Sequence, residues 1–175
     1  MKYLFSLSMM SLLLMFATTV NAQSKEDKSK RPSPPALVTQ KVGNTQVTID
    51  YSQPSVKGRT IGVDLEPKKG EVWRTGANEA TVFEVDNDVH INNQLLPKGK
   101  YALFTIDNGN EWTIIFNKTW KQWGAFKYNK ADDALRINVK AKKADPFAEK
   151  MTFTISAEGV VSLVWGDKKV EFSAK

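Results

Sequence analysis

Cysteine is absent from the 175-residue sequence, and histidine occurs once, as His90. Without thiols the chain can form no disulfide, no thiolate nucleophile and no cysteine-ligated metal site. One histidine excludes His-rich zinc centres, and a Ser-His-Asp triad would have to use His90. His90 alternates with apolar neighbours, so it is predicted to lie on the wetter face of a strand. No glycine-rich phosphate loop follows a predicted strand, and the acidic pairs stand at predicted turns, so we predict no metal site and no cofactor.

The N-terminal residues have the pattern of a secretory signal peptide. Lys2 precedes a long apolar stretch, and small side chains ending at Ala22 suit signal peptidase. We expect residues 1–22 to be removed, which leaves a periplasmic or secreted protein with no transmembrane segment. Residues 23–35 combine lysines, an arginine and three prolines, which predicts a disordered basic tether. A single domain over residues 36–175 is expected to follow.

Short apolar runs separated by turn residues fill the remainder of the chain, and no amphipathic helix of ordinary length occurs. Their even spacing predicts an all-β fold, a two-sheet antiparallel β-sandwich (jelly-roll-like) of about ten short strands. Residues 37–51 predict a hairpin, and residues 100–106, apolar on both faces, predict a central strand. Residues 52–70 are expected to form a long loop of the kind that is often functional. Asp145-Pro146 is expected to break a strand, and Gly166-Asp167 to be a turn in a closing meander.

One compact stretch, residues 73–81 (WRTGANEAT), combines an aromatic ring, both charges and an amide. Arg74 and Glu79 flank a turn that contains Asn78, and such charges occur in functional sites. The alternative is a structural corner, in which Arg74 pairs with Glu79, Asn78 caps the turn and Trp73 fills the core. The residues alone leave both interpretations open.

A second candidate is the aromatic stretch over residues 119–128, which contains Trp120, Trp123 and Tyr128 interleaved with lysines. Exposed rings on a β-sandwich suit stacking on sugars or on peptide side chains. Alternatively, these rings cover an open end of the core. Aromatic and basic residues also occur together on single-strand nucleic-acid platforms, but an exported protein makes a nucleic-acid partner unexpected.

Several stretches of the chain have a specific pattern: YSQPSVKGR (51–59), EVWRTGANEAT (71–81), LPKGKYALFTI (96–106), EWTIIFNK (111–118) and QWG (122–124). In these stretches the chain resembles the exported bacterial family called domain of unknown function 2911. The resemblance implies a secreted or periplasmic β-rich single domain, brings no activity, substrate or cofactor, and adds Lys100 and Trp123 to the candidate positions. The stretch IGVDLEPKK (residues 61–69) departs from the expected pattern.

The favoured hypothesis is a binding module for a small polar or carbohydrate-like ligand of the cell envelope. Arg74 and Asn78 would supply hydrogen bonds and a tryptophan would stack on the ligand. One alternative is a structural or interaction protein of the envelope; another is a hydrolase or lyase with Glu79 or an aspartate as base and Arg74 as charge stabiliser. No catalytic residue and no oligomeric state is predicted. The candidate ligand-binding residues are Trp73, Arg74, Asn78, Glu79, Lys100 and Trp123.

Overall fold

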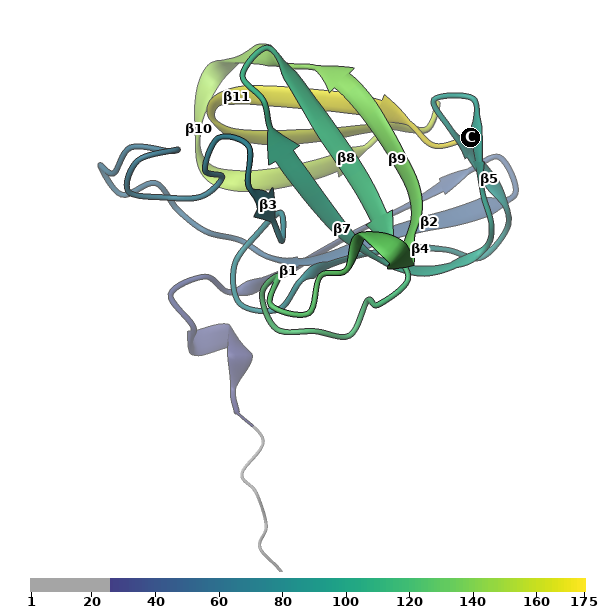
Figure 1. The fold of residues 1–175 in the computed structure, drawn as a ribbon, viewed down its shortest axis with the longest axis horizontal. Helices are drawn as coiled ribbons and strands as arrows, with labels where there is room; N and C mark the ends of the chain where they lie inside the picture. Colours follow the sequence, from purple (N-terminus) through teal and green to yellow (C-terminus); the bar gives the residue numbers. More distant parts are fainter. Residues whose placement is uncertain (1–25) are drawn as a thin grey trace, which may run out of the picture.

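The computed structural model describes residues 26–175, so the predicted signal peptide lies outside the described residues. The described chain is all-β with antiparallel pairing, which confirms the predicted fold class (Figure 1). The strands are β1 (Pro35–Val42), β2 (Thr45–Ser52), β3 (Val72–Trp73), β4 (Thr81–Val85), β5 (Val89–Ile91), β6 (Gln94–Leu96), β7 (Gly99–Asp107), β8 (Glu111–Asn117), β9 (Asp133–Lys140), β10 (Lys142–Ile155) and β11 (Val160–Ser173), with short 3-10 helices η1 (Lys28–Lys30) and η2 (Lys130–Asp132).

The main layer is a seven-stranded sheet in the order β1-β2-β4-β7-β8-β9, with β3 also paired to β7. Along this path the strands follow one another in chain order, while β3 pairs only with β7 and β5 and β6 form a separate hairpin. β7 lies between β4 and β8 and is buried along most of its length, as two apolar faces require. The predicted hairpin is formed by β1 and β2, whose register places Val42 opposite Thr45.

The second layer is the β10–β11 hairpin, which covers the inner face of the sheet. β10 lies next to β1, and β11 lies next to β9. Aromatic rings join the two layers: Tyr51 meets Phe153 at 5.1 Å between ring centroids, and Phe116 meets Phe172 at 5.7 Å, both edge to face. A short β5–β6 hairpin closes one end of the core, where Ile91 bridges to Ala174.

The C-terminal region differs from the expected meander. Asp145-Pro146 does not end a strand but lies within the 14-residue β10, at a shift in register between Lys143 and Ala148. Gly166 is paired with Ala148 inside β11 and does not form a turn. A bulge absorbs an irregular residue without ending the strand, so the two long strands form one bent hairpin.

The N-terminal segment also differs from expectation. Residues 26–34, which were predicted to belong to a disordered tether, lie against the domain at its lower end in Figure 1, beside the loop between β8 and β9. The backbone amide of Gln53 donates to the carbonyl of Pro34 at 2.9 Å, and Asn78 donates to the carbonyl of Ser33 at 3.0 Å.

Within residues 26–175, no helix is long and apolar enough to cross a membrane.

Candidate functional site

The stretch WRTGANEAT (residues 73–81) is called the motif below. Its residues 74–80 loop out of the sheet, and this loop is called the excursion. Trp73 is paired with Thr105 of β7, and Thr81 with Leu103 of the same strand. β3 and β4 therefore pair with successive parts of the same edge of β7. The seven residues between them, 74–80, loop out of the sheet at the level of Phe104. The amide of Thr81 donates to the carbonyl of Arg74 at 3.1 Å, which closes the neck of the excursion.

Hydrogen bonds and close packing within the motif hold the excursion in shape. Trp73 is 2% exposed, and its indole Nε1 donates to the carbonyl of Gly76 at 3.0 Å. The hydroxyl of Thr81 donates to the carbonyl of Thr75 at 2.7 Å. A Cβ at Gly76 would lie 3.0 Å from the carbonyl oxygen of Ser52 and 3.0 Å from the Thr81 hydroxyl, so a larger residue would have to displace these atoms by a few tenths of an ångström. Trp73 is therefore a core residue and presents no face on which a ligand could stack.

The aromatic stretch over residues 119–128 is a loop that pairs with the excursion. The amide of Ala80 donates to the carbonyl of Gln122 at 3.0 Å, and the amide of Gly124 donates to the carbonyl of Asn78 at 2.9 Å. Gln122 is buried, and its side-chain amide bonds to the loop's own backbone. The ring of Tyr128 packs on Phe104 at 5.1 Å on the outer face of the sheet. The loop is therefore held in place at both ends.

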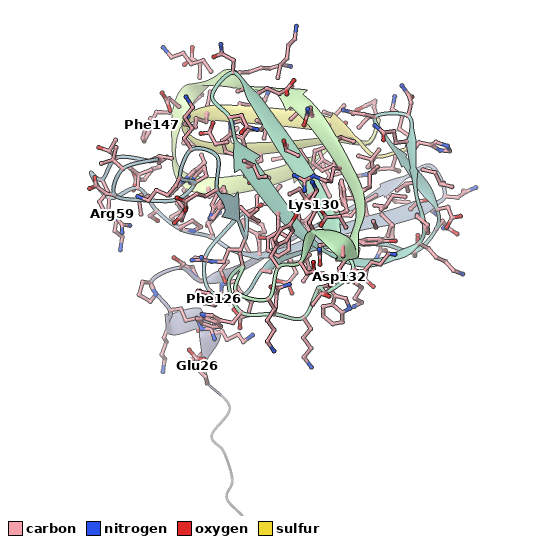
Figure 2. The ribbon with its side chains drawn as sticks, viewed as in Figure 1. Glu26, Arg59, Phe126, Lys130, Asp132 and Phe147 are labelled. Carbon is pink, nitrogen blue, oxygen red and sulfur yellow. The ribbon has the colours of Figure 1, made fainter. Side chains whose placement is uncertain are left out.

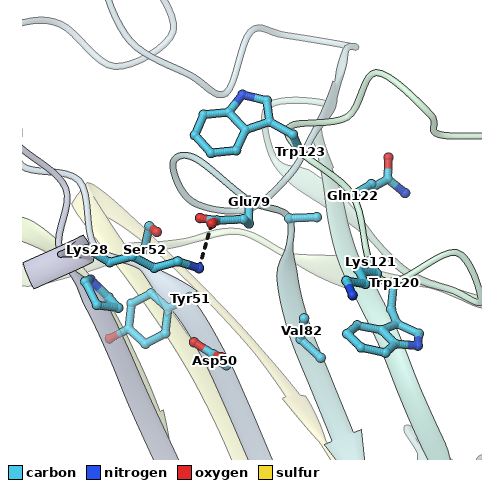
Figure 3. A pocket seen from close by; sticks show the side chains of 12 residues that line it. Lys28, Asp50, Tyr51, Ser52, Glu79, Val82, Trp120, Lys121, Gln122 and Trp123 are labelled. Carbon is cyan, nitrogen blue, oxygen red and sulfur yellow. Dashed lines mark hydrogen bonds and ion pairs between the residues drawn. The ribbon is translucent and has the colours of Figure 1, made fainter. Parts of the chain in front are cut away.

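The excursion and this loop enclose a cleft of about 400 Å³ on the outer face of the sheet (Figure 3). β2 and β4 supply its floor: Asp50 is paired with Val82, and both point outward because Ile49 and Phe83 beside them are fully buried. Trp123 is 54% exposed and Trp120 is 37% exposed. The lining residues are Lys28, Pro35, Asp50, Tyr51, Ser52, Glu79, Ala80, Val82, Trp120, Lys121, Gln122 and Trp123.

Glu79 is paired with the N-terminal segment and not with Arg74. Lys28 Nζ lies 2.8 Å from Glu79 Oε1, and Arg31 Nη1 lies 2.7 Å from Glu79 Oε2. Burial raises the pKa of Glu79, but the hydrogen bonds from Lys28 and Arg31 outweigh it and lower the pKa to about 2. The guanidinium of Arg31 also lies over the ring of Trp123, 5.5 Å from its centroid. Two cations of the N-terminal segment thus hold Glu79, and one of them, Lys28, also lines the cleft.

Asp50 is the second carboxylate of the cleft, and it makes no hydrogen bond or ion pair within the described part of the chain. Burial raises its pKa; Lys28 and Lys100 oppose this effect, and the charge of Glu79 adds to it. Lys100 lies 3.0 Å from Glu84, and its ammonium is 5.6 Å from the centroid of the Trp120 ring. Lys100 therefore positions Trp120 and does not line the cleft itself.

Arg74 lines a different cavity, of about 240 Å³, and shares no cavity with Glu79. The Arg74–Glu79 pair of the structural-corner interpretation is not formed, because Glu79 is paired with Lys28 and Arg31. Asn78 was predicted as a ligand-binding residue, but its side chain bonds to the N-terminal segment. The sequence reasoning missed Asp50 and Lys28 as cleft residues. Asp50 alternates with apolar neighbours, which predicts a wet face, but only the strand order shows that this face is beneath residues 119–128.

The fold and the cleft together define an all-β domain with an open, aromatic-walled pocket on the outer face of its larger sheet. A family model described as "Protein of unknown function (DUF2911)" matches residues 33–174, and the chain belongs to this family. No curated protein and no solved structure matches the chain. Among residues 26–175, no group of three or more histidine, cysteine or acidic side chains is placed to hold a metal ion.

Proposed function

We propose that this domain is a binding module for a small polar, carbohydrate-like ligand, which occupies the cleft between β2, β4 and residues 119–128. The observation that carries the proposal is the combination, in one cleft, of two partly exposed tryptophan rings with the carboxylate of Asp50, which has no partner within residues 26–175. A volume of about 400 Å³ falls within the roughly 300–1,000 Å³ typical of small-molecule sites.

The two kinds of wall suit the two kinds of surface that a sugar presents. Trp120 and Trp123 offer flat apolar faces for the C–H face of a ring, and rigid aromatic side chains lose little entropy on binding. Asp50, Glu79 and Lys121 offer acceptors and a donor for hydroxyl groups. Glu79 is paired with Lys28 and Arg31, whereas Asp50 has no partner within residues 26–175, so an amino group that reaches Asp50 is favoured over an acidic group.

The predicted signal peptide supports the location of this ligand. A chain exported through its N-terminal signal would meet small polar molecules of the cell envelope, in the periplasm or outside the cell. We therefore place the proposed ligand among envelope sugars and their amino derivatives.

The test is a titration of the mature protein with glucosamine oligomers, with their N-acetylated forms and with uronic acids. Three of the five tryptophans, Trp73, Trp112 and Trp165, are fully buried, so a change in intrinsic fluorescence reports on Trp120 and Trp123. We expect saturable binding of the amino sugars, with weaker or no binding of the uronic acids.

Two variants should weaken this binding and one matched variant should not. Trp123→Ala removes a stacking face, and truncation of a tryptophan at the centre of a binding site typically costs more than about 1 kcal/mol, or about fivefold or more in affinity. Asp50→Asn removes the charge that favours an amino group. Phe126→Ala removes an aromatic ring from the same loop that is 87% exposed and does not line the cleft. The absence of saturable binding by any sugar, or unchanged binding by Trp123→Ala, would contradict the proposal.

The two alternatives fare differently. The structural interpretation describes Trp73, Thr75 and Gly76, whose contacts hold the excursion in shape. The hydrolase or lyase hypothesis placed Glu79 or an aspartate beside Arg74. Glu79 lines the other cavity, and Asp64, the aspartate that lines the Arg74 cavity, accepts a hydrogen bond from the amide of Thr60. No observation in the cleft favours a catalytic role, so the binding module is the function that the geometry supports best.

A further inference from the structure

A second cavity, of about 240 Å³, lies between the loop over residues 53–71 and the opposite side of the motif excursion. Figure 2 shows Arg59 of this loop at one edge of the molecule, away from Phe126 at the end that carries the first cleft. The two cavities have no lining residue in common. The second cavity is lined by Ser33, Pro54, Arg59, Asp64, Leu65, Glu66, Lys68, Trp73, Arg74, Gly76, Ala77 and Trp165.

Arg74 is the unusual residue of this cavity. Its guanidinium makes no hydrogen bond and no ion pair within residues 26–175, and its Nε is buried without a partner. Burial lowers the pKa of Arg74, and the charge of Glu66 opposes this effect. A buried donor left unpaired costs about 1–3 kcal/mol, and more when the group is charged. This cost belongs to the inaccessible Nε, whereas the two terminal nitrogens of the guanidinium are not buried in this way and make no hydrogen bond within residues 26–175, so they are the donors that a ligand in the cavity could reach.

The two carboxylates of the cavity are already engaged. Glu66 Oε2 accepts from the backbone amide of Lys68 at 2.9 Å, and Asp64 Oδ2 accepts from the amide of Thr60 at 2.8 Å. Both side chains shape the long loop around its own backbone. They leave Arg74 without a paired carboxylate.

The other two cations of the cavity are also engaged. Arg59 donates to the carbonyls of Val56 at 3.1 Å and Ser55 at 2.8 Å, and Lys68 Nζ donates to the carbonyl of Val63. Arg74 is thus the one cation of the three whose side chain makes no hydrogen bond within residues 26–175. Because three cations and two carboxylates line the cavity, the lining carries one net positive charge.

We propose that this cavity is a binding site for a small monocarboxylate, whose two oxygens accept hydrogen bonds from the guanidinium of Arg74. The planar guanidinium matches a carboxylate in a two-bond arrangement. The partly exposed Pro54, Leu65 and Ala77 line the cavity with apolar atoms that suit a short hydrocarbon body. A phosphate dianion fits less well, because one net positive charge would not neutralise it and Glu66 would repel it.

This inference goes beyond the proposed sugar-binding function, since it concerns a separate cavity and a ligand of opposite charge. It also explains why the motif contains an arginine that the fold itself does not use. Failure of the sugar titrations would leave it standing, and its own failure would leave the sugar site standing.

The experiment is a titration of the ¹⁵N-labelled mature protein with butyrate, at constant ionic strength in chloride and followed by NMR. Butyramide, which has nearly the same shape and no charge, is the matched control ligand, and inorganic phosphate tests the other oxyanion. We expect saturable shifts from butyrate alone, concentrated at residues 59–68 and 73–77 and at the Arg74 Nε–H signal. This readout uses the native chain and does not depend on whether a variant folds.

Arg74→Gln should weaken butyrate binding at least tenfold. Lys69→Gln, which removes the same charge from an exposed position of the same loop that does not line the cavity, should leave binding within twofold. Several outcomes would overturn the proposal: no saturable shift from butyrate, equal shifts from butyramide, shifts confined to the first cleft, phosphate binding at Arg74 in place of carboxylate, or undiminished binding by a folded Arg74→Gln.

Discussion

Glu79→Gln should release the N-terminal segment from the domain. Glu79 receives both charged contacts that the segment makes with the motif, from Lys28 at 2.8 Å and from Arg31 at 2.7 Å. The glutamine keeps the size of the side chain but loses its charge and one of its acceptor oxygens. The backbone contact at Pro34 and the contact at Ser33 remain, so we expect more frequent opening of residues 26–34 and no unfolding of the domain.

The size of the effect follows from the pKa of Glu79. A fall from its ordinary value of 4.5 to about 2 would correspond to about 3 kcal/mol for a fully buried group. The Glu79 side chain is 38% exposed, so solvent screening reduces this figure, and exposed pairs contribute only about 0.2–1 kcal/mol each. We therefore expect Glu79→Gln to cost about 1 kcal/mol of docking free energy, or about a fivefold increase in the open population.

Hydrogen exchange of peptides covering residues 26–34 measures this opening at neutral pH. Glu84→Gln is the matched control, because it removes the same charge from an ion pair with Lys100 on the same face of the sheet and does not contact the segment. The expected result is faster exchange in Glu79→Gln alone. Equal exchange in Glu79→Gln and the native protein would refute the reasoning.

The sign of the pH dependence gives a second check on Glu79. Its folded-state pKa is lower than its unfolded-state value, so its contribution is fully present above about pH 4.5 and is lost as the pH falls towards 2. An NMR titration of the Glu79 carboxyl should therefore show a midpoint far below 4.5. An ordinary midpoint would show that Lys28 and Arg31 do not hold the carboxylate.

Three further predictions concern the scaffold around the two cavities. Phe104→Ala should lower the free energy of unfolding by about 3–5 kcal/mol in chemical denaturation, because the fully buried ring supports the loop over residues 119–128. Gly159→Ala should lower the melting temperature more than Gly109→Ala: both positions have positive φ, but only at Gly159 would the Cβ lie 2.3 Å from the carbonyl oxygen of Ala174. Burial and a neighbouring carboxylate raise the pKa of Tyr128 to about 12. The contribution of Tyr128 to the stability of the folded protein is therefore present below pH 10 and is lost as the pH rises towards 12. Tyr128→Phe should remove the last phenol to ionise in an ultraviolet titration.

The parts of the fold that were predictable from the sequence are those set by local alternation. The β1–β2 hairpin has apolar residues at every second position and a tight turn, and β7 is apolar on both faces, so both could be placed without tertiary information. The predictions of a strand end at Asp145-Pro146 and of a turn at Gly166 were wrong, because the residue types that end a strand also occur at a bulge within one. Whether such a residue ends a strand depends on the partner strand.

The candidate site was predictable only in part, for a related reason. Spacing along the chain placed Arg74 and Glu79 on either side of a turn, and a turn was expected to bring them together. The excursion over residues 74–80 leaves the sheet, so its residues face two sides. Trp123 was identified as an aromatic of interest, but its cation, Arg31, comes from a segment whose composition indicated disorder. Local composition carries no information about a distant carboxylate that orders such a segment.

The excursion over residues 74–80 separates the two cavities. The amide of Ala77 donates to the carbonyl of Ser52 at 3.3 Å, and Ser52 lines the first cavity while Ala77 lines the second. Arg74 and Glu79 stand on opposite sides of this contact. Because the neck of the excursion is closed by Thr81, deletion of residues 74–80 would disturb both cavities and the pairing of β3 and β4 with β7 at once. The two binding proposals can therefore be separated only by single substitutions, at Arg74 for one cavity and at Asp50 or Trp123 for the other.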